Sequence, residues 1–147
     1  MKLFFLLCGA SALYICNATC QTAGQTSPVT ASVQFNDGQT ATVTDFSGFV
    51  GVHPNEAVTI TVHFPVASAG TPMVVDLADG GISGIGSSIP VVAADGSATF
   101  AFVARAKPGR NSIVVRAGQT SVILQLWVID SANPQNNPPS MIAVSNG

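Results

Sequence analysis

The sequence has 147 residues, of which only 8% are charged, and its formal net charge is −2. Soluble proteins ordinarily carry roughly 25% charged residues. So few charges, with a slight acidic excess, argue against nucleic acid or an anionic membrane surface as the partner. The length is sufficient for one domain with its own hydrophobic core.

The first 20 residues have the pattern of a signal peptide. Lys2 follows the first methionine, and residues 3–15 form an apolar stretch that is too short to span a bilayer. Small residues then offer cleavage sites, so we expect the first 18 to 20 residues to be removed. The mature protein is then secreted, periplasmic or held at the cell surface, with no segment inserted in the membrane. A short cytosolic N-terminal helix is the alternative interpretation.

All three cysteines, Cys8, Cys16 and Cys20, lie in or beside this segment. No disulfide can therefore cross the mature domain, and its stability must come from its core. Cys20 has a second interpretation, as the lipidated first residue of a bacterial lipoprotein. The preceding Asn17-Ala18-Thr19 fits the lipoprotein motif poorly, and lipidation stays open beside ordinary cleavage.

A polar leader is predicted at residues 21–30 and is followed by a β-hairpin. Two short alternating runs, residues 31–35 and 40–44, flank Asn36-Asp37-Gly38. Asparagine, aspartate and glycine tolerate the positive φ angles of a tight hairpin turn, which is why the two runs are expected to pair.

The clearest strand is predicted at residues 56–64, after a loop at residues 46–55 that contains two glycines and a proline. Apolar side chains alternate with polar ones along this strand, and Pro65 ends it because proline cannot donate to a sheet. The strand should therefore have one buried side. Its inward residues are Val58, Ile60, Val62 and Phe64.

A further strand is predicted at residues 73–78, and a flexible glycine-rich connection follows at residues 79–88. Residues 89–93 are expected to form a strand at a sheet edge, where Pro90 is tolerated. Residues 95–130 then contain three apolar runs separated by tight turns, which predicts an antiparallel meander.

About eight strands with turns every 8 to 12 residues favour a single antiparallel β-sandwich at residues 31–130. One side of each alternating strand should fill its core. The predicted core residues are Val58, Ile60, Val62, Phe64, Val75, Leu77, Phe100, Phe102, Ile113, Val115, Leu124 and Leu126. Residues 131–147 are predicted to be a Pro/Asn-rich tail with a short apolar run, Met141-Ile-Ala-Val144, near its end.

Residues 28–130 resemble the bacterial immunoglobulin-like domains of surface adhesins and other secreted proteins. The resemblance rests on Asp95-Gly-Ser-Ala-Thr-Phe, the Lys107-Pro-Gly-Arg turn, Ile113-Val-Val-Arg-Ala and the alternating last strand. It implies an immunoglobulin-like sandwich of about seven to eight strands. Because these motifs are turns and alternation, they specify a fold and not an activity. Such domains usually serve as spacers, stalks or adhesive modules.

No pattern in the sequence indicates catalysis or a cofactor. His53 and His63 lack the spacing of a metal site and are expected to be surface residues, and there is no Gly-x-Ser-x-Gly elbow. Asp37, Asp79 and Asp95 fit turn positions, where an aspartate binds its own backbone. A loop calcium site that uses aspartate oxygens stays open.

Two features are candidate binding determinants. All four cations beyond Lys2 lie on one predicted hairpin, and either they are solvated strand ends or they form an electrostatic docking edge. These cations are Arg105, Lys107, Arg110 and Arg116. The last strand is apolar on both sides, so its second side is either covered or forms an interaction patch. That second side consists of Ile123, Trp127 and Ile129.

We expect Trp127 to lie on the outer face of the last sheet, covered either by the apolar run of the tail or by a neighbouring subunit. The sequence therefore favours a secreted, non-enzymatic module for cell-surface binding, adhesion or assembly, with a protein partner or a second copy. The alternative is a carbohydrate-binding or accessory module of an extracellular hydrolytic system. Sugar binding usually needs exposed aromatic platforms, and Trp127 is the only tryptophan.

Overall fold

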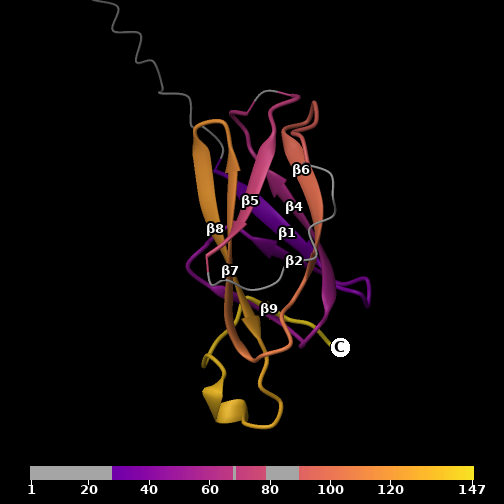
Figure 1. Ribbon diagram of the computed structural model, residues 1–147, viewed down its shortest axis with the longest axis vertical. Helices are drawn as coiled ribbons and strands as arrows, with labels where there is room; N and C mark the ends of the chain where they lie inside the picture. The colour runs from indigo at the N-terminus through magenta and orange to yellow at the C-terminus, as the bar shows by residue number, and fades with distance from the viewer. Residues whose placement is uncertain (1–27, 68, 79–89) are drawn as a thin grey trace, which may run out of the picture.

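The structure is a computed structural model that describes residues 28–67, 69–78 and 90–147. In this part of the chain, nine strands form two sheets that pack against each other (Figure 1). The two sheets confirm the predicted all-β, sandwich-like architecture. The predicted signal peptide, residues 21–27 of the leader and the glycine-rich connection at residues 79–88 lie outside the described residues.

The first sheet has four antiparallel strands in the order β2-β1-β4-β6. Its members are β1 (Thr30–Gln34), β2 (Thr40–Val43), β4 (Ala57–His63) and β6 (Ser97–Val103). β1 and β2 form the predicted hairpin, and Gly38 in its turn takes the expected positive φ of 85°. The predictions of this hairpin and of the strand at residues 56–64 are confirmed.

The second sheet has five strands in the order β5-β7-β8-β3-β9. Its members are β3 (Phe49–Val52), β5 (Met73–Leu77), β7 (Gly109–Ala117), β8 (Thr120–Val128) and β9 (Ala143–Val144). β5, β7 and β8 pair antiparallel. The predicted meander is divided, however, because β6 belongs to the first sheet while β7 and β8 belong to the second.

The prediction of a purely antiparallel sandwich is wrong for the second sheet. β3 runs parallel to β8, with Phe49 opposite Gln125, and β9 runs parallel to β3, with Val144 opposite Gly51. Part of the predicted loop at residues 46–55 is therefore a strand. Parallel pairing joins segments far apart in the sequence, so no turn marks it, and Gly51 lowers the strand propensity of an already short run.

The strand predicted at residues 89–93 is also wrong in its described part. Only an isolated bridge joins Val91 to Pro72. Backbone hydrogen bonds run from Met73 N to Pro90 O at 2.8 Å and from Val92 N to Thr71 O at 2.9 Å. Pro90 has no N–H to continue a ladder, so the contact with the start of β5 stays local.

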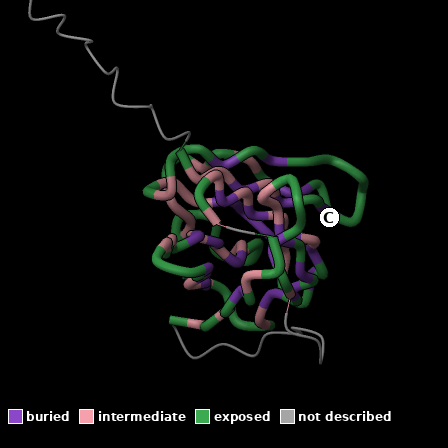
Figure 2. The backbone as a smooth tube through the Cα atoms, turned by 90° about the horizontal axis from the view of Figure 1, so that it is seen from above, coloured by how far each residue is buried: buried purple, intermediate pink, exposed green. Residues whose placement is uncertain are grey.

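The core lies between the sheets, where buried residues occupy the interior of the backbone (Figure 2). Ten of the twelve predicted core residues are buried, and Phe102, Ile113 and Leu126 are completely inaccessible. Val75 and Leu77 are only partly buried because β5 is the last strand of its sheet and, among the described strands, pairs with β7 alone. The inward and outward sides of β4, β6, β7 and β8 are therefore as predicted.

The tail is more ordered than the predicted linker. Asp130 Oδ1 accepts a hydrogen bond from Asn133 N at 2.9 Å, and its Oδ2 accepts one from Asn136 Nδ2 at 2.9 Å. A short 3₁₀ helix, η1 (Pro134–Asn136), lies within this network. The tail then returns to the sandwich as β9, near the lower end of the strands in Figure 1.

Candidate functional site

The outer face of the five-stranded sheet carries most of the predicted binding residues. Along β7 and β8 it consists of the positions that alternate with the buried Ile113 and Leu124. Register places Arg110 opposite Trp127 and Val114 opposite Ile123. The outward positions of the two strands therefore share one surface, which we call the outer B face.

Trp127 is half-buried at one end of this face. Its ring packs on the ring of Phe49 in a T-shaped arrangement with a centroid separation of 5.4 Å, and its Nε1 donates to Asn137 Oδ1 at 3.1 Å. The guanidinium of Arg110 lies 5.7 Å from the centroid of the Phe49 ring. Phe49 is thus the centre of an aromatic–cation cluster. The sequence does not indicate this cluster, because the glycines and the proline of residues 46–55 predict a loop there.

The end of the tail packs beside this cluster, against the backbone of Gly51, which has no side chain. A Cβ atom at Gly51 would lie 2.6 Å from Met141 Sδ, 3.2 Å from Val144 Cγ2 and 3.4 Å from Ile129 Cδ1. The absence of a side chain at Gly51 therefore makes room for the side chain of Met141. The tail folds back onto the sandwich, as in one of the two alternatives for the cover of Trp127. Its strand pairs with β3, however, and Asn137 is the tail residue that hydrogen-bonds to the indole of Trp127.

The other end of the outer B face is apolar and exposed. Val74 and Ile123 have 47% and 45% of their surfaces accessible. Arg116 forms an ion pair with Asp76 on the same face, and both side chains are about half exposed. A surface ion pair of this kind contributes little to stability, so its groups are available to a partner at small cost.

Two of the predicted binding residues do not belong to this face. Arg105 and Lys107 lie in the turn between β6 and β7, where Arg105 Nε donates to the Lys107 carbonyl at 3.1 Å. Arg110 and Arg116 lie near opposite ends of β7. The four cations therefore do not gather on one edge in the structure, in contrast to the electrostatic docking edge suggested by their spacing.

A buried polar cluster joins the end of the chain to the loop before β4. Glu56 and Ser145 have only 8% and 4% of their surfaces exposed, and Ser145 Oγ donates to Glu56 Oε1 at 2.5 Å. Glu56 Oε2 accepts the backbone N–H of His53 at 2.7 Å. His53 Nε2 lies 3.3 Å from the Ser145 carbonyl oxygen. His53 is thus half-buried and part of the cluster, unlike the surface residue predicted.

This cluster has the residue types of a hydrolase triad but not its geometry. In a triad the imidazole accepts the proton of the serine hydroxyl. Here the hydroxyl of Ser145 is bound to Glu56, and the imidazole of His53 faces the carbonyl oxygen instead. The arrangement fixes the tail. Among the described residues, no three His, Cys, Asp or Glu side chains gather closely enough to hold a metal ion.

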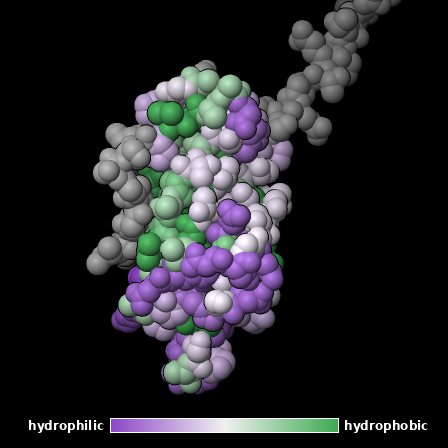
Figure 3. Space-filling view, turned by 90° about the vertical axis from the view of Figure 1, so that its right-hand side faces the viewer, coloured by the Kyte–Doolittle hydropathy of each residue, from purple (hydrophilic) through white to green (hydrophobic). Residues whose placement is uncertain are grey.

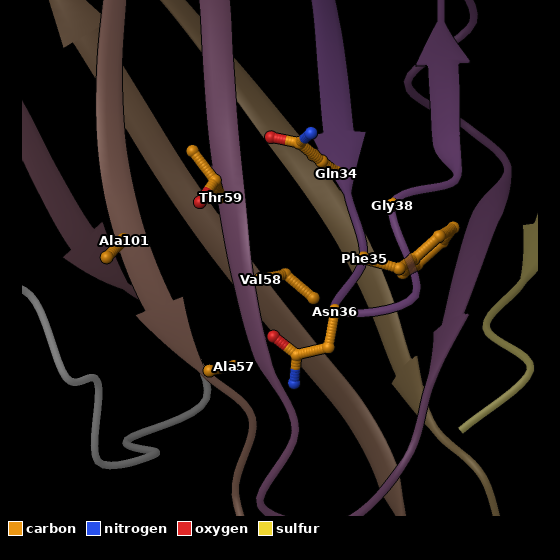
Figure 4. A pocket seen from close by; sticks show the side chains of 8 residues that line it. All are labelled: Gln34, Phe35, Asn36, Gly38, Ala57, Val58, Thr59 and Ala101. Carbon is orange, nitrogen blue, oxygen red and sulfur yellow. The ribbon is translucent and has the colours of Figure 1, made fainter.

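A shallow pocket lies on the outer face of the four-stranded sheet, with a volume of about 270 Å³. Its polar lining comes from Gln34, Asn36 and Thr59, while Ala57 and Ala101 keep it open (Figure 4). The lining is neutral, and the ring of Phe35 is buried. Neutral amides and hydroxyls of this kind can bind an uncharged polar ligand but present no platform for stacking.

The described turn aspartates have the structural role that was predicted. Asp37 Oδ1 accepts Gln39 N at 2.9 Å, and Asp95 Oδ1 accepts Ser97 N at 2.9 Å. The Ser97 hydroxyl, followed by its N–H, lowers the pKa of Asp95 below the ordinary 3.8. The carboxylate is therefore held ionised by its own turn.

Searches for similar proteins found no matching family model, no matching curated sequence and no matching solved structure. Among the described residues, no helix has the length and apolar character required to cross a membrane.

Proposed function

We propose that this protein is a secreted, non-enzymatic module with an immunoglobulin-like sandwich, and that it binds a protein partner at the cell surface through the outer B face. The observation that carries the proposal is the composition of that face. An aromatic–cation cluster at Phe49, Trp127 and Arg110 lies on the same surface as the exposed Val74 and Ile123.

Such a composition is typical of protein interfaces. Aromatic residues and arginine are enriched in their energetically important centres, and apolar side chains supply the area that excludes water. The Phe49 contacts hold the arginine and the indole in fixed positions, so less conformational entropy is lost on binding. The Asp76–Arg116 pair offers one group of each sign to a partner.

The remaining polar chemistry supports binding rather than catalysis. The buried Glu56–Ser145 pair anchors the tail, and the turn aspartates cap their own loops. Secretion and a cell-surface role are also proposed. They rest on the predicted signal peptide and on the resemblance to adhesin domains.

A carbohydrate-binding or accessory role is the second candidate, and the pocket beside Gln34, Asn36 and Thr59 favours it. Amide and hydroxyl groups are the usual partners of sugar hydroxyls. The lining of the pocket lacks an exposed aromatic ring, the feature on which sugars commonly stack. Protein binding by the outer B face is therefore better supported than carbohydrate binding by this pocket.

The two candidates are separated by binding of the labelled protein to the surface of the cells that produce it. Ile123→Glu should weaken this binding by roughly tenfold or more, because it places a charge in the apolar part of the face. Thr59→Glu alters the pocket on the other sheet and should leave the binding unchanged. Weakening by Thr59→Glu alone, with competition by neutral oligosaccharides, would instead establish the carbohydrate role.

A further inference from the structure

Asn146 is the only asparagine in the sequence that is followed by glycine. In such a pair the backbone nitrogen of the glycine can attack the asparagine side chain, because glycine has no Cβ atom to block the approach. The other asparagines precede larger residues or proline, and the nitrogen of proline carries no proton. Asn146 and Gly147 are both exposed, so water reaches the peptide bond between them.

Both reacting groups of this pair are held by other parts of the molecule. Asn146 Nδ2 donates a 3.0 Å hydrogen bond to Asp37 Oδ2, in the turn between β1 and β2. A carboxylate only accepts hydrogen bonds, so it is the nitrogen of the Asn146 side chain that lies toward Asp37. Gly147 N donates to Ser145 Oγ at 3.2 Å, and that hydroxyl donates to Glu56. The attacking nitrogen and the leaving group are thus each bound elsewhere.

We propose that the Asn146–Gly147 pair is a site of spontaneous deamidation, and that the reaction releases this segment irreversibly from the β1–β2 turn. The Gly147 nitrogen forms a bond to Asn146 Cγ, and ammonia leaves with Nδ2 and the proton of the Gly147 nitrogen. Water then opens the cyclic imide: its hydroxyl adds to one of the two ring carbonyl carbons, and its remaining hydrogen goes to the ring nitrogen. The product has an aspartyl or isoaspartyl group at position 146, and no oxidant or reductant is needed.

The contacts of the native structure slow the first step. The Gly147 N–H that must lose its proton is bound to Ser145, and the side chain that must be attacked is held by Asp37. The carboxylates of Asp37 and Glu56 also disfavour this proton loss, because they would repel the anion that it creates. The reaction therefore proceeds mainly from molecules in which this segment has opened locally, and its rate follows the population of that open state.

Deamidation exchanges the hydrogen-bond donor of Asn146 for a negative charge. The new carboxylate would face Asp37 Oδ2, which now accepts the Asn146 amide at 3.0 Å. Two carboxylates repel each other and neither can donate a hydrogen bond, so the modified segment does not return to the turn. The release extends back to Ser145, whose hydroxyl and N–H stay bound to Glu56 and Gly51. None of these steps depends on binding by the outer B face.

Peptide mapping by mass spectrometry, on the full chain kept at mildly alkaline pH, measures the reaction. Asn146 should deamidate faster than every other asparagine, and Asn146→Gln, which would require a larger ring, should remain almost unmodified. Asp37→Ser should raise the native rate by roughly threefold or more, because the loss of one hydrogen bond increases the open population by about this factor. Asp45→Ser is the matched control. Asp37 and Asp45 both accept the N–H two residues ahead, and Asp37 is the one that is hydrogen-bonded to Asn146.

The same measurement in concentrated urea separates the contact from intrinsic reactivity. The wild type, Asp37→Ser and Asp45→Ser should then deamidate at one common rate, which is higher than the native rate of the wild type. NMR relaxation of the Gly147 amide tests the release itself. This amide should be ordered in the wild type and mobile in Asn146→Asp, which reproduces the change of charge. Adding Asp37→Lys to Asn146→Asp should restore its order, since the two groups then attract.

Three results would each overturn the proposal. The first is an Asn146 that stays unmodified in the native protein while other asparagines deamidate. The second is a native rate that is no higher in Asp37→Ser than in Asp45→Ser. The third is a Gly147 amide that is as ordered in Asn146→Asp as in the wild type.

Discussion

The hydroxyl of Ser145 donates a 2.5 Å hydrogen bond to the buried carboxylate of Glu56, which fixes the last residues of the chain against the loop before β4. The same hydroxyl oxygen accepts Gly147 N at 3.2 Å, and Ser145 N donates to Gly51 O at 3.0 Å. Glu56 is the only glutamate in the sequence. Its burial makes sense because the tail supplies a partner for its charge.

Ser145→Ala should therefore lower the free energy of unfolding by about 1–3 kcal/mol, since it leaves a buried carboxylate oxygen without its donor. Urea denaturation provides the measurement, and Ser121→Ala, at an exposed position of β8, is the control with an expected change below about 0.5 kcal/mol. A double-mutant cycle with Glu56→Gln should show that the two effects are coupled. Additive effects would mean that the contact is not formed in solution.

Gly51→Ala should destabilise the protein by about 1–3 kcal/mol, because its new methyl group would overlap Met141. Thermal and urea denaturation will measure the loss. Met141→Ala makes room for this methyl group, so the double variant should lose less stability than the sum of the two single variants. If Met141→Ala gives no such compensation, the tail does not pack on β3 as described.

Asn137→Ala should shift the fluorescence of Trp127 to longer wavelength. Its amide oxygen accepts the indole N–H and also Asp130 N, at 3.1 and 2.8 Å, so its removal opens the indole to water. Gln119→Ala, in the exposed turn before β8, should leave the spectrum unchanged. Deletion of residues 131–147 should produce a larger shift at every dilution, as expected for cover supplied within one molecule. A shift that follows protein concentration would assign the cover to a second subunit.

Asn111→Leu should leave stability unchanged or raise it by about 1–2 kcal/mol. Asn111 is completely buried, and its Nδ2 has no hydrogen-bond partner in the described part of the chain. Its Oδ1 accepts a long 3.5 Å bond from Arg105 N. Ile113→Ala, at the next inward position of β7, should cost about 2–5 kcal/mol and serves as the comparison. A comparable loss in Asn111→Leu would show that the amide binds a buried water.

Asp130→Asn should destabilise the protein at neutral pH but not in acid. The Asn136 amide, and then the Asn133 N–H, lower the pKa of Asp130 below the ordinary 3.8. A carboxyl group with a lowered folded-state pKa stabilises the fold above its unfolded pKa, and this contribution is lost as the pH falls through the folded value. Urea denaturation of both proteins from about pH 2 to pH 7 should show curves that converge below about pH 4. A constant difference would contradict the assignment.

Alternation identified most of the core correctly because it reports local geometry. Phe100 and Phe102 lie on one side of β6 whatever that strand pairs with, and so do Leu124 and Leu126 in β8. Val75 and Leu77 follow the same alternation but are less covered, since the sequence does not state that β5 is an edge strand. Periodicity gives the side on which a residue lies, and position in the sheet gives its exposure.

The candidate binding face was only partly predictable. Trp127 and Ile123 followed from the apolar second side of the last strand, and Arg110 and Arg116 from their place in the cation cluster. Phe49 and the Glu56–Ser145 contact did not follow, because each depends on segments that meet only in the folded chain. Gly48 and Gly51 favour a loop when the sequence is considered alone, whereas in the structure the side chains of Ile142 and Met141 pack against their backbone.

The sequence by itself determined β1, β2 and β4 to β8, the inward sides of most of them, the β1–β2 turn and the shortage of charge, because each depends on neighbouring residues or on composition. Only the tertiary structure decided that β3 and β9 join the sheet in parallel, and that the tail is fixed to Glu56. These features depend on which distant segments pair. Pairing is chosen by the free energy of the whole fold, and no local pattern encodes it.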